Sequence, residues 1–363
     1  MRLPPQHDSA VLRDAAALHD AAPPRNTRPS IRGRLLNLLL DVAVRRPLAR
    51  RELHELPATR LRLDRMGTRL PVPPNVRRDA ADLGGIPAEW TRVAGVSDPR
   101  RTVLYLHGGA FLLGSPRMYR GLTADLAQRT AADVVAIDYR LAPEHPFPAA
   151  LDDAERAYLQ LLADGRQPGQ VVVMGDSAGG NLTLALLQRL RDGGSPMPAG
   201  AVTFSPWLDL AAEYTQAQVR SARDPMLPAT RIREAAGLYH GETDARHPLV
   251  SPLGLDFRGM PPLLIQAGER ELLLPAQEAF ARRGQSVGAS LSFRVWPNMP
   301  HVFQAFARVL PEAREALGDV ATFVQHLVPA AATRTGTHAG VDVAEETAIG
   351  ASTRKGAGMG TRA

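Results

Sequence analysis

The sequence contains no cysteine, and this absence removes three kinds of chemistry at once. Disulfide bonds, metal sites built from thiolates and a cysteine nucleophile are all excluded. Long apolar runs are absent too: stretches such as LLNLLL at 35–40 fall far short of the ~20 residues that a membrane-spanning helix needs. The N-terminal stretch MRLPPQHDSAVLRDAAALHD carries charges throughout and lacks the apolar core of a secretory signal. We therefore expect a soluble, cytoplasmic protein without stable membrane insertion.

Lysine is almost absent as well, because Lys355 is the single lysine among the 43 basic residues. The net charge of +6 comes from the N-terminal part, where residues 1–101 contain 19 arginines against 11 acidic residues. Such a segment could contact nucleic acid or anionic lipid. A solvated surface of arginine-rich helices explains the charge more simply, because the rest of the chain carries 24 basic against 26 acidic residues. We therefore predict no nucleic-acid partner.

Three regions differ in composition. Residues 1–75 are rich in arginine and proline and include a stretch with helical periodicity, IRGRLLNLLLDVAVRRPLARREL. Residues 76–329 alternate strand-like and helix-like segments. Residues 330–363 consist largely of alanine, glycine and threonine without periodicity, so they cannot bury enough surface to offset the entropy of ordering. We expect this last segment to be a disordered tail.

Short β-branched or apolar runs in the middle region predict strands, and helical patterns such as 178–192 and 311–327 lie between or after them. Near-continuous apolar strands separated by helices indicate an α/β protein with a mostly parallel sheet covered on both faces. Residues 206–260 are too long for a simple crossover, mostly polar and helix-like, so they predict an insertion. The predicted strands are 102–107, 134–139, 171–175, 201–205, 263–268 and 291–296.

The strongest chemical motif is VVVMGDSAGGN at 171–181, where a strand runs through GDSAG into a helix. This G-x-S-x-G pattern is typical of a nucleophile elbow, with Ser177 as the nucleophile on a strained turn. Glycines two residues before and after the serine remove side chains that would collide there. The following helix N-terminus offers N–H groups and a positive dipole end to an oxyanion. Asp176, beside the nucleophile, is interpreted as structural, anchoring the elbow or a neighbouring loop.

A second motif, YLHGGAF at 105–111, also follows a strand directly. Its two glycines let backbone N–H groups approach a substrate oxygen, so Gly108, Gly109 and Ala178 are the expected oxyanion-hole donors. An ordinary glycine turn is the plainer alternative. His107 has no metal-ligating neighbour at a suitable spacing, and we expect it to hold the loop by packing or hydrogen bonding.

The catalytic histidine is expected in WPNMPHVF at 296–303, after the last predicted strand. Of the ten histidines, His301 alone lies where the chain order serine, acid, histidine requires it. The other nine are explained as surface, loop or cap residues. This chemistry needs no cofactor and no metal.

Together with DYRLAPEHPFPAA (138–150), SPWLDL (205–210) and PPLLIQAGE (261–269), these motifs make the chain resemble the hormone-sensitive-lipase-like family of α/β-hydrolases. Members of that family are mostly bacterial carboxylesterases. The resemblance covers residues 75–328 and implies an α/β-hydrolase fold with an eight-stranded, mostly parallel sheet. It also implies a catalytic domain at 76–329 and a helical cap, formed by the helices of residues 1–75 and the insertion at about 206–260.

The resemblance raises the question of which residue is the triad acid. The family pattern after the seventh strand is Gly-x-x-Asp-x-Leu-x-Asp, with the first aspartate as the acid. Here Gly268 and Leu273 match, Glu271 stands at the first aspartate and Pro275 at the second. We therefore predict a Ser177, Glu271, His301 triad. Glu269 is the alternative acid and is otherwise a solvated loop carboxylate, while the loss of the second aspartate leaves open what supports this loop.

The predicted function is a serine carboxylesterase that acts on short- to medium-chain acyl esters through an acyl-enzyme, as a monomer or homodimer. An amidase or lactonase would use the same triad, and the sequence does not separate these from an esterase. A non-catalytic small-ligand receptor is the third candidate, because the resemblance extends to the plant gibberellin receptors. Those receptors lack the catalytic histidine, whereas this chain has His301.

Overall fold

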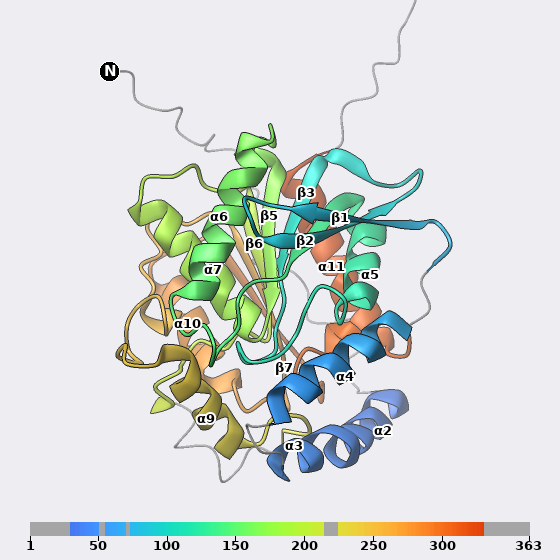
Figure 1. Ribbon diagram of the computed structural model, residues 1–363, viewed down its shortest axis with the longest axis vertical. Helices are drawn as coiled ribbons and strands as arrows, with labels where there is room; N and C mark the ends of the chain where they lie inside the picture. Colours follow the sequence, from blue (N-terminus) through green and yellow to red (C-terminus); the bar gives the residue numbers. More distant parts are fainter. Residues whose placement is uncertain (1–29, 51–54, 70–72, 214–223, 330–363) are drawn as a thin grey trace, which may run out of the picture. The chain divides into compact units, whose positions relative to one another are not determined.

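The computed structural model describes residues 30–50, 55–69, 73–213 and 224–329. The predicted tail at 330–363 lies outside the described residues, as do residues 1–29 of the predicted cap. The described chain forms one sheet of eight strands in the order β1-β2-β4-β3-β5-β6-β7-β8, mostly parallel, with helices on both faces (Figure 1). The predicted α/β-hydrolase architecture is thereby confirmed. The strands are β1 Val76–Asp82, β2 Pro87–Val93, β3 Asp98–Leu106, β4 Ala132–Ile137, β5 Val171–Asp176, β6 Gly200–Phe204, β7 Leu263–Gly268 and β8 Leu291–Trp296.

The six strands predicted from apolar runs all form, with ends shifted by a few residues at most, and β7 and β8 match the predicted ranges. The pattern missed the hairpin of β1 and β2, which pairs antiparallel at the sheet edge and joins β4 through β2. Its first strand, VRRDAAD, is polar and only partly buried. An edge strand needs no continuous apolar run, because much of its surface faces water.

Helices cover both faces of the sheet. Successive side chains along each strand point to opposite faces, so both sets of apolar side chains need a covering layer. On β3, Val103 and Tyr105 pack toward α5 and α11, whereas Leu104 and Leu106 pack toward α6 and α7. α10 completes the second face by packing against β7 and β8. The helices of the two faces are α5 Arg120–Thr130, α6 Ala149–Ala163, α7 Ala178–Asp192, α10 Leu274–Ser286 and α11 Pro311–Leu327.

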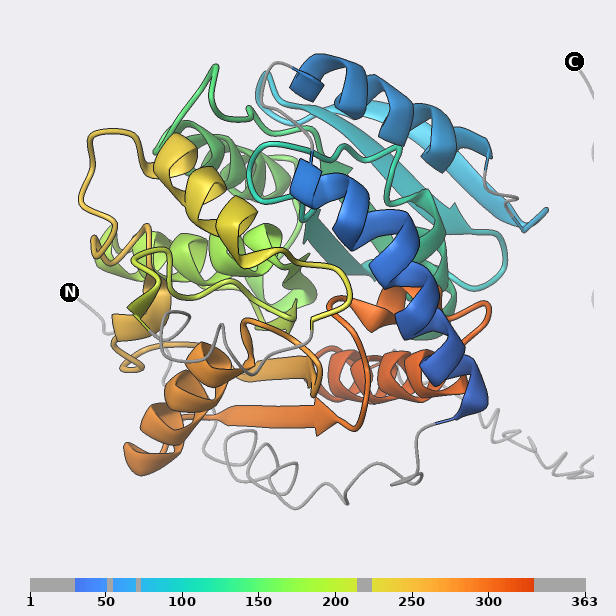
Figure 2. The same ribbon diagram turned by 90° about the horizontal axis from the view of Figure 1, so that it is seen from below.

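The N-terminal helices lie across the loops at the carboxyl ends of the strands (Figure 2). α2 begins after Ser30, whose side chain accepts the Gly33 N–H and donates to Glu312 of α11. Leu36 and Leu40 of α2 are buried against the main core, where fully burying one leucine contributes about 1.5–3 kcal/mol. The segment consists of α2 Ile31–Leu40, a π-helical turn Asp41–Arg45, α3 Arg46–Arg50 and α4 Leu56–Arg69.

The structure describes the insertion at 206–260 except for residues 214–223. Its described residues include the helix α9 Ala229–His240, in agreement with the helix-like pattern, and a short 3₁₀ turn, Pro252–Gly254. α9 contacts α3, and the Arg231 side chain donates to the Ala49 carbonyl at 3.3 Å. The insertion and the N-terminal helices therefore meet, which supports the proposal that they form a cap together.

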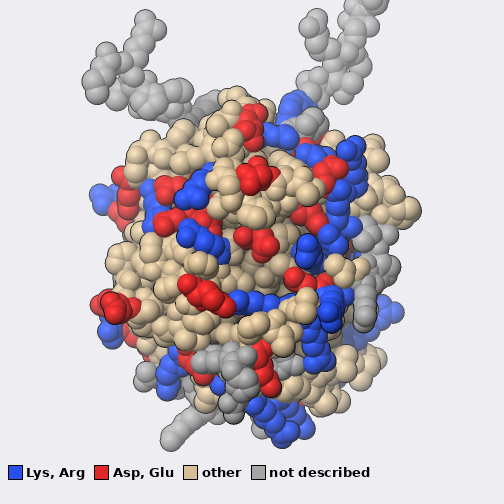
Figure 3. All heavy atoms as spheres, viewed as in Figure 1, with Lys and Arg blue, Asp and Glu red and all other residues tan. Residues whose placement is uncertain are grey.

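Many arginines of the basic N-terminal part are paired with acidic side chains. Arg78 lies 3.6 Å from Glu89, and Arg92 lies 3.0 Å from Asp79 and 3.3 Å from Asp133. Figure 3 shows the result on one face of the molecule, where acidic and basic side chains are interspersed. In the part of the chain that the structure describes, no helix is both long and apolar enough to cross a membrane.

Candidate active site

Ser177 lies at the sharp turn between β5 and α7, with φ of 53° and ψ of −117°. A left-handed conformation in a non-glycine residue costs on the order of 1–3 kcal/mol and persists only where its surroundings hold it. Here the Ser177 N–H donates to the Phe204 carbonyl at 2.8 Å, and the Ser177 carbonyl accepts the Trp207 N–H at 3.0 Å. A Cβ on Gly179 would overlap the Leu106 carbonyl, which explains the glycine two residues after the serine.

The structure brings the three predicted triad side chains together. His301 Nε2 is 2.9 Å from Ser177 Oγ, and His301 Nδ1 is 3.2 Å from Glu271 Oε2. All three residues are buried. β5, β6, β7 and β8 lie side by side in the sheet and run parallel. The loops that follow β5, β7 and β8 therefore bring residues 94 and 30 positions apart along the chain together at one edge of the sheet.

The Glu271 carboxylate is held by more than the histidine. Oε1 accepts the Ser205 hydroxyl at 2.7 Å and the Gly268 N–H, while Oε2 also accepts the Gln277 amide at 3.3 Å. Neither Ser205 nor Gln277 was predicted from the sequence. Ser205 was findable in part, because it follows β6 directly, and β6 pairs in parallel with β7, after which Glu271 stands.

Glu269 takes a different position from its neighbour two residues on. Its side chain is exposed and accepts the Asn298 N–H at 2.6 Å. Glu269 therefore links residues 269–273 between β7 and α10, here called the acid loop, to the loop that carries His301. Glu271, not Glu269, lies against the imidazole.

The glycine loop after β3 differs from the expectation in one respect. The Gly108 N–H donates to Asp176 Oδ1 at 2.9 Å, so it is not available to a substrate oxygen. Among the described residues, the N–H groups of Gly109, Ala110 and Ala178 have no hydrogen-bond acceptor. Ala110 was not predicted as a donor from the sequence. It follows Gly109 and has a φ of 57°, a positive value that most residues other than glycine avoid.

Asp176 is the acceptor that occupies the Gly108 N–H group. Its buried carboxylate accepts Tyr105 Oη at 2.7 Å and Tyr119 Oη at 2.8 Å as well as the Gly108 N–H. Burial raises the pKa of Asp176, although these hydrogen bonds oppose the rise. A Cβ on Gly108 would overlap this carboxylate. Asp176 thus anchors the glycine loop to the elbow, which is the structural part interpreted for it from the sequence.

His107 holds the same loop from the other side. Its Nδ1 donates to the Gly108 carbonyl at 2.8 Å, and its ring stacks on Tyr139 with centroids 4.2 Å apart. Burial lowers the pKa of His107 to about 4, so the ring is neutral at neutral pH. No group of three or more metal-ligating side chains occurs within the described ranges.

His301 has the opposite electrostatic setting. Burial acts to lower its pKa, but the hydrogen bond and charge of Glu271, together with the charges of Asp224 and Asp176, raise it above the ordinary value of 6.5. Three carboxylates from three separate segments therefore favour the protonated imidazole. A site of this kind stabilises an imidazolium that forms when a neighbouring hydroxyl loses its proton.

Comparison with known proteins gives relatives of one kind. A model of the alpha/beta hydrolase fold family matches residues 103–305. An acetyl-hydrolase of Streptomyces hygroscopicus is 44% identical over 256 residues, 70% of this chain and 84% of that protein. An esterase of Acinetobacter venetianus is 36% identical over 268 residues, 73% of this chain and 87% of that protein.

A solved structure of an esterase from the bacterial hormone-sensitive lipase family is 34% identical, with a TM-score of 0.76. The match covers 83% of this chain and 100% of that one. The chain therefore belongs to the hormone-sensitive-lipase-like family of α/β-hydrolases. Since these relatives are named esterase or acetyl-hydrolase, the prediction of an ester-hydrolysing enzyme is confirmed at the level of class.

Proposed function

We propose that this protein is a serine carboxylesterase in which Ser177, His301 and Glu271 form the catalytic triad. In the first step His301 Nε2 accepts the hydroxyl proton as Ser177 Oγ attacks the ester carbonyl. The imidazolium then protonates the departing alcohol, leaving an acyl-serine. In the second step the neutral imidazole takes a proton from water as the water oxygen attacks the acyl carbon. The imidazolium then returns this proton to Ser177 Oγ as the bond between the acyl carbon and Oγ breaks, which releases the carboxylic acid and restores the free serine.

The observation that carries this proposal is the continuous chain of contacts from Ser177 Oγ through the imidazole to Glu271. The Glu271 carboxylate accepts a hydrogen bond from His301 Nδ1, so it favours the tautomer with the proton on Nδ1. In that tautomer the lone pair of Nε2 faces the Ser177 hydroxyl. The same contact favours an enzyme over a receptor on this fold, because a receptor has no need of a base at the serine.

The proposed oxyanion hole consists of the N–H groups of Gly109, Ala110 and Ala178. Gly109 and Ala110 lie on the loop after β3, and Ala178 begins α7 directly after Ser177. All three N–H groups lack acceptors within the described chain. Donors aimed at the developing negative charge contribute a large part of catalysis, since removing one costs ~10²–10³ in kcat. Gly108 serves instead to fix the loop through Asp176.

Short acyl chains are the proposed substrates. The acetyl-hydrolase relative acts on a small acyl group by its name, and the insertion at 206–260 has no strongly apolar segment of the kind that covers a lipase site. We expect p-nitrophenyl esters from acetyl to hexanoyl to be hydrolysed fastest and long-chain triglycerides poorly. The measurement is kcat/KM against acyl length. Activity that rises steadily beyond the dodecanoyl ester, with activation at an oil–water interface, would identify a lipase instead.

The pH dependence should reflect the raised pKa of His301. The base must be neutral to accept the Ser177 proton, so kcat/KM is expected to fall on the acid side with an apparent pKa above 6.5. A pH–rate profile with an ester whose alcohol does not ionise in this range measures it. A second ester with a different leaving group is the control, since both must report the same acid limb. An apparent pKa at or below the ordinary value would contradict the described electrostatics.

A further inference from the structure

Asp224 is a buried carboxylate that the proposed triad does not use. It is 3% exposed and belongs to the insertion that follows β6. Its Oδ1 accepts the N–H groups of Met226 at 2.7 Å and Leu227 at 2.9 Å. Both hydrogen bonds of this local turn use Oδ1, so Oδ2 is left for another donor.

That second oxygen crosses to the acid loop. Asp224 Oδ2 accepts the N–H of Leu272 at 2.9 Å, and Leu272 is the residue directly after Glu271. Leu272 is itself buried, so its N–H would lose a partner that water cannot replace if Asp224 were removed. The position where the family pattern has its second aspartate is Pro275, which offers no carboxylate. Support for this loop thus comes from a segment 48 residues earlier in the chain.

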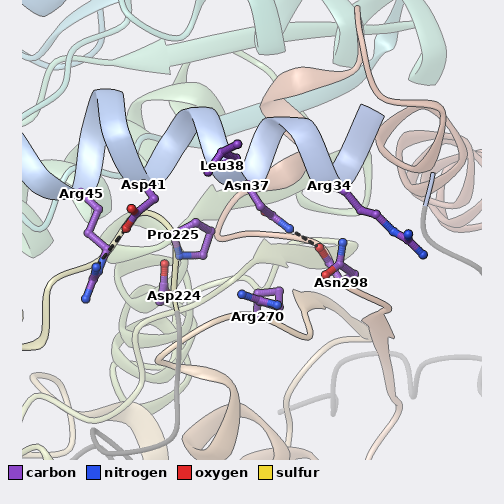
Figure 4. A pocket seen from close by; sticks show the side chains of 9 residues that line it. All are labelled: Arg34, Asn37, Leu38, Asp41, Arg45, Asp224, Pro225, Arg270 and Asn298. Carbon is purple, nitrogen blue, oxygen red and sulfur yellow. Dashed lines mark hydrogen bonds and ion pairs between the residues drawn. The ribbon is translucent and has the colours of Figure 1, made fainter. Parts of the chain in front are cut away.

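A cavity of about 600 Å³ lies between α2 and the acid loop, and Asp224 lines it (Figure 4). Arg34 lines it from α2, Asp41 and Arg45 from the π-helical turn after α2, and Arg270 from the acid loop. Asp41 is paired with Arg45 at 3.0 Å. The charge of Asp224 also helps to raise the pKa of His301, together with the charges of Glu271 and Asp176. Asp224 therefore lines a charged cavity, binds the acid loop and acts electrostatically on the catalytic imidazole.

We propose that Asp224 is a positioning residue for the Glu271–His301 pair, through which the insertion fixes the acid loop and supplies a carboxylate that acts on the imidazole through its charge. The inference rests on the proposed triad. Under this proposal the insertion also helps to position the catalytic acid. A movement of the turn at residues 224–227 would move the backbone of Leu272, next to Glu271.

The test is Asp224→Asn, which keeps the size of the side chain but removes its charge and one acceptor. We expect kcat to fall about 10- to 100-fold with little change in KM, as is typical of a small misplacement of catalytic groups. The acid limb of the pH–rate profile should move to lower pH, because one carboxylate that raises the pKa of His301 is gone. Asp224→Glu, which keeps the charge, should leave the acid limb near that of the parent even if kcat falls.

Asp41→Asn is the matched control, because Asp41 lines the same cavity but binds only arginines in the described chain. It should leave both kcat and the pH profile unchanged. Melting temperatures of all variants identify any loss of folded protein. An Asp224→Asn enzyme with the acid limb of the parent, or one in which only the folded fraction falls, would overturn the proposal.

Direct titration of the His301 ring by NMR separates this inference from the proposed function. The His301 signal is assigned by its absence in His301→Ala. If the parent protein hydrolyses no ester, the proposed function fails, but a lower His301 pKa in Asp224→Asn would still support the positioning role. An unchanged His301 pKa would refute that role whether or not the parent is active.

Discussion

Replacing Ser177 with alanine is expected to lower kcat for a p-nitrophenyl ester by about 10⁵–10⁶, and His301→Ala should cost the same order. Each variant removes one end of the 2.9 Å contact between Ser177 Oγ and His301 Nε2. Without the hydroxyl no acyl-enzyme forms, and without the imidazole the hydroxyl keeps its proton. The measurement is kcat at saturating ester, with the enzyme fully separated from host esterases.

The double variant makes this test sharper. Because the two residues act as a unit, Ser177→Ala/His301→Ala should be no slower than either single variant. A fluorophosphonate that reacts with activated serines should label the parent and neither variant. Labelling of Ser177→Ala, or losses that add in the double variant, would show that the nucleophile lies elsewhere.

Glu271→Gln is expected to lower kcat by about 10³–10⁴ with the fold intact. The amide removes the charge that stabilises the imidazolium, and its NH₂ group can hold His301 in the wrong tautomer. Glu269→Gln should change kcat little, because the Glu269 side chain is exposed and an amide oxygen can still accept the Asn298 N–H. An exposed carboxylate of this kind contributes under about 1 kcal/mol. Both changes keep the side-chain shape and remove one charge from the same loop.

The contrast between the two glutamines decides which carboxylate is the acid. A slow Glu269→Gln beside an active Glu271→Gln would reverse the assignment, and two active variants would place the acid outside this loop. Glu271 also accepts from Ser205 and Gly268, so its replacement could weaken the fold. Thermal unfolding of each variant against the parent therefore accompanies the kinetics.

The sequence by itself determined the parts of this protein that depend on local pattern. Apolar runs such as Leu263–Gly268 predicted the inner strands, because a strand buried on both faces must be apolar at nearly every position. The polar β1 carries no such signal, and the hairpin at the sheet edge was missed. Ser177 was predictable because the elbow needs its glycines at fixed positions, and His301 because of its place in the chain order.

Tertiary structure decided what depends on contacts between distant segments. A loop pattern could not show that Asp176 occupies the Gly108 N–H, that Glu269 turns toward Asn298, or that Ser205 and Asp224 hold the loop of Glu271. Each of these contacts is a single hydrogen bond between residues 29 to 68 positions apart. Such bonds leave no periodicity in the sequence, since they depend on how the ends of neighbouring parallel strands and the insertion are brought to one edge of the sheet.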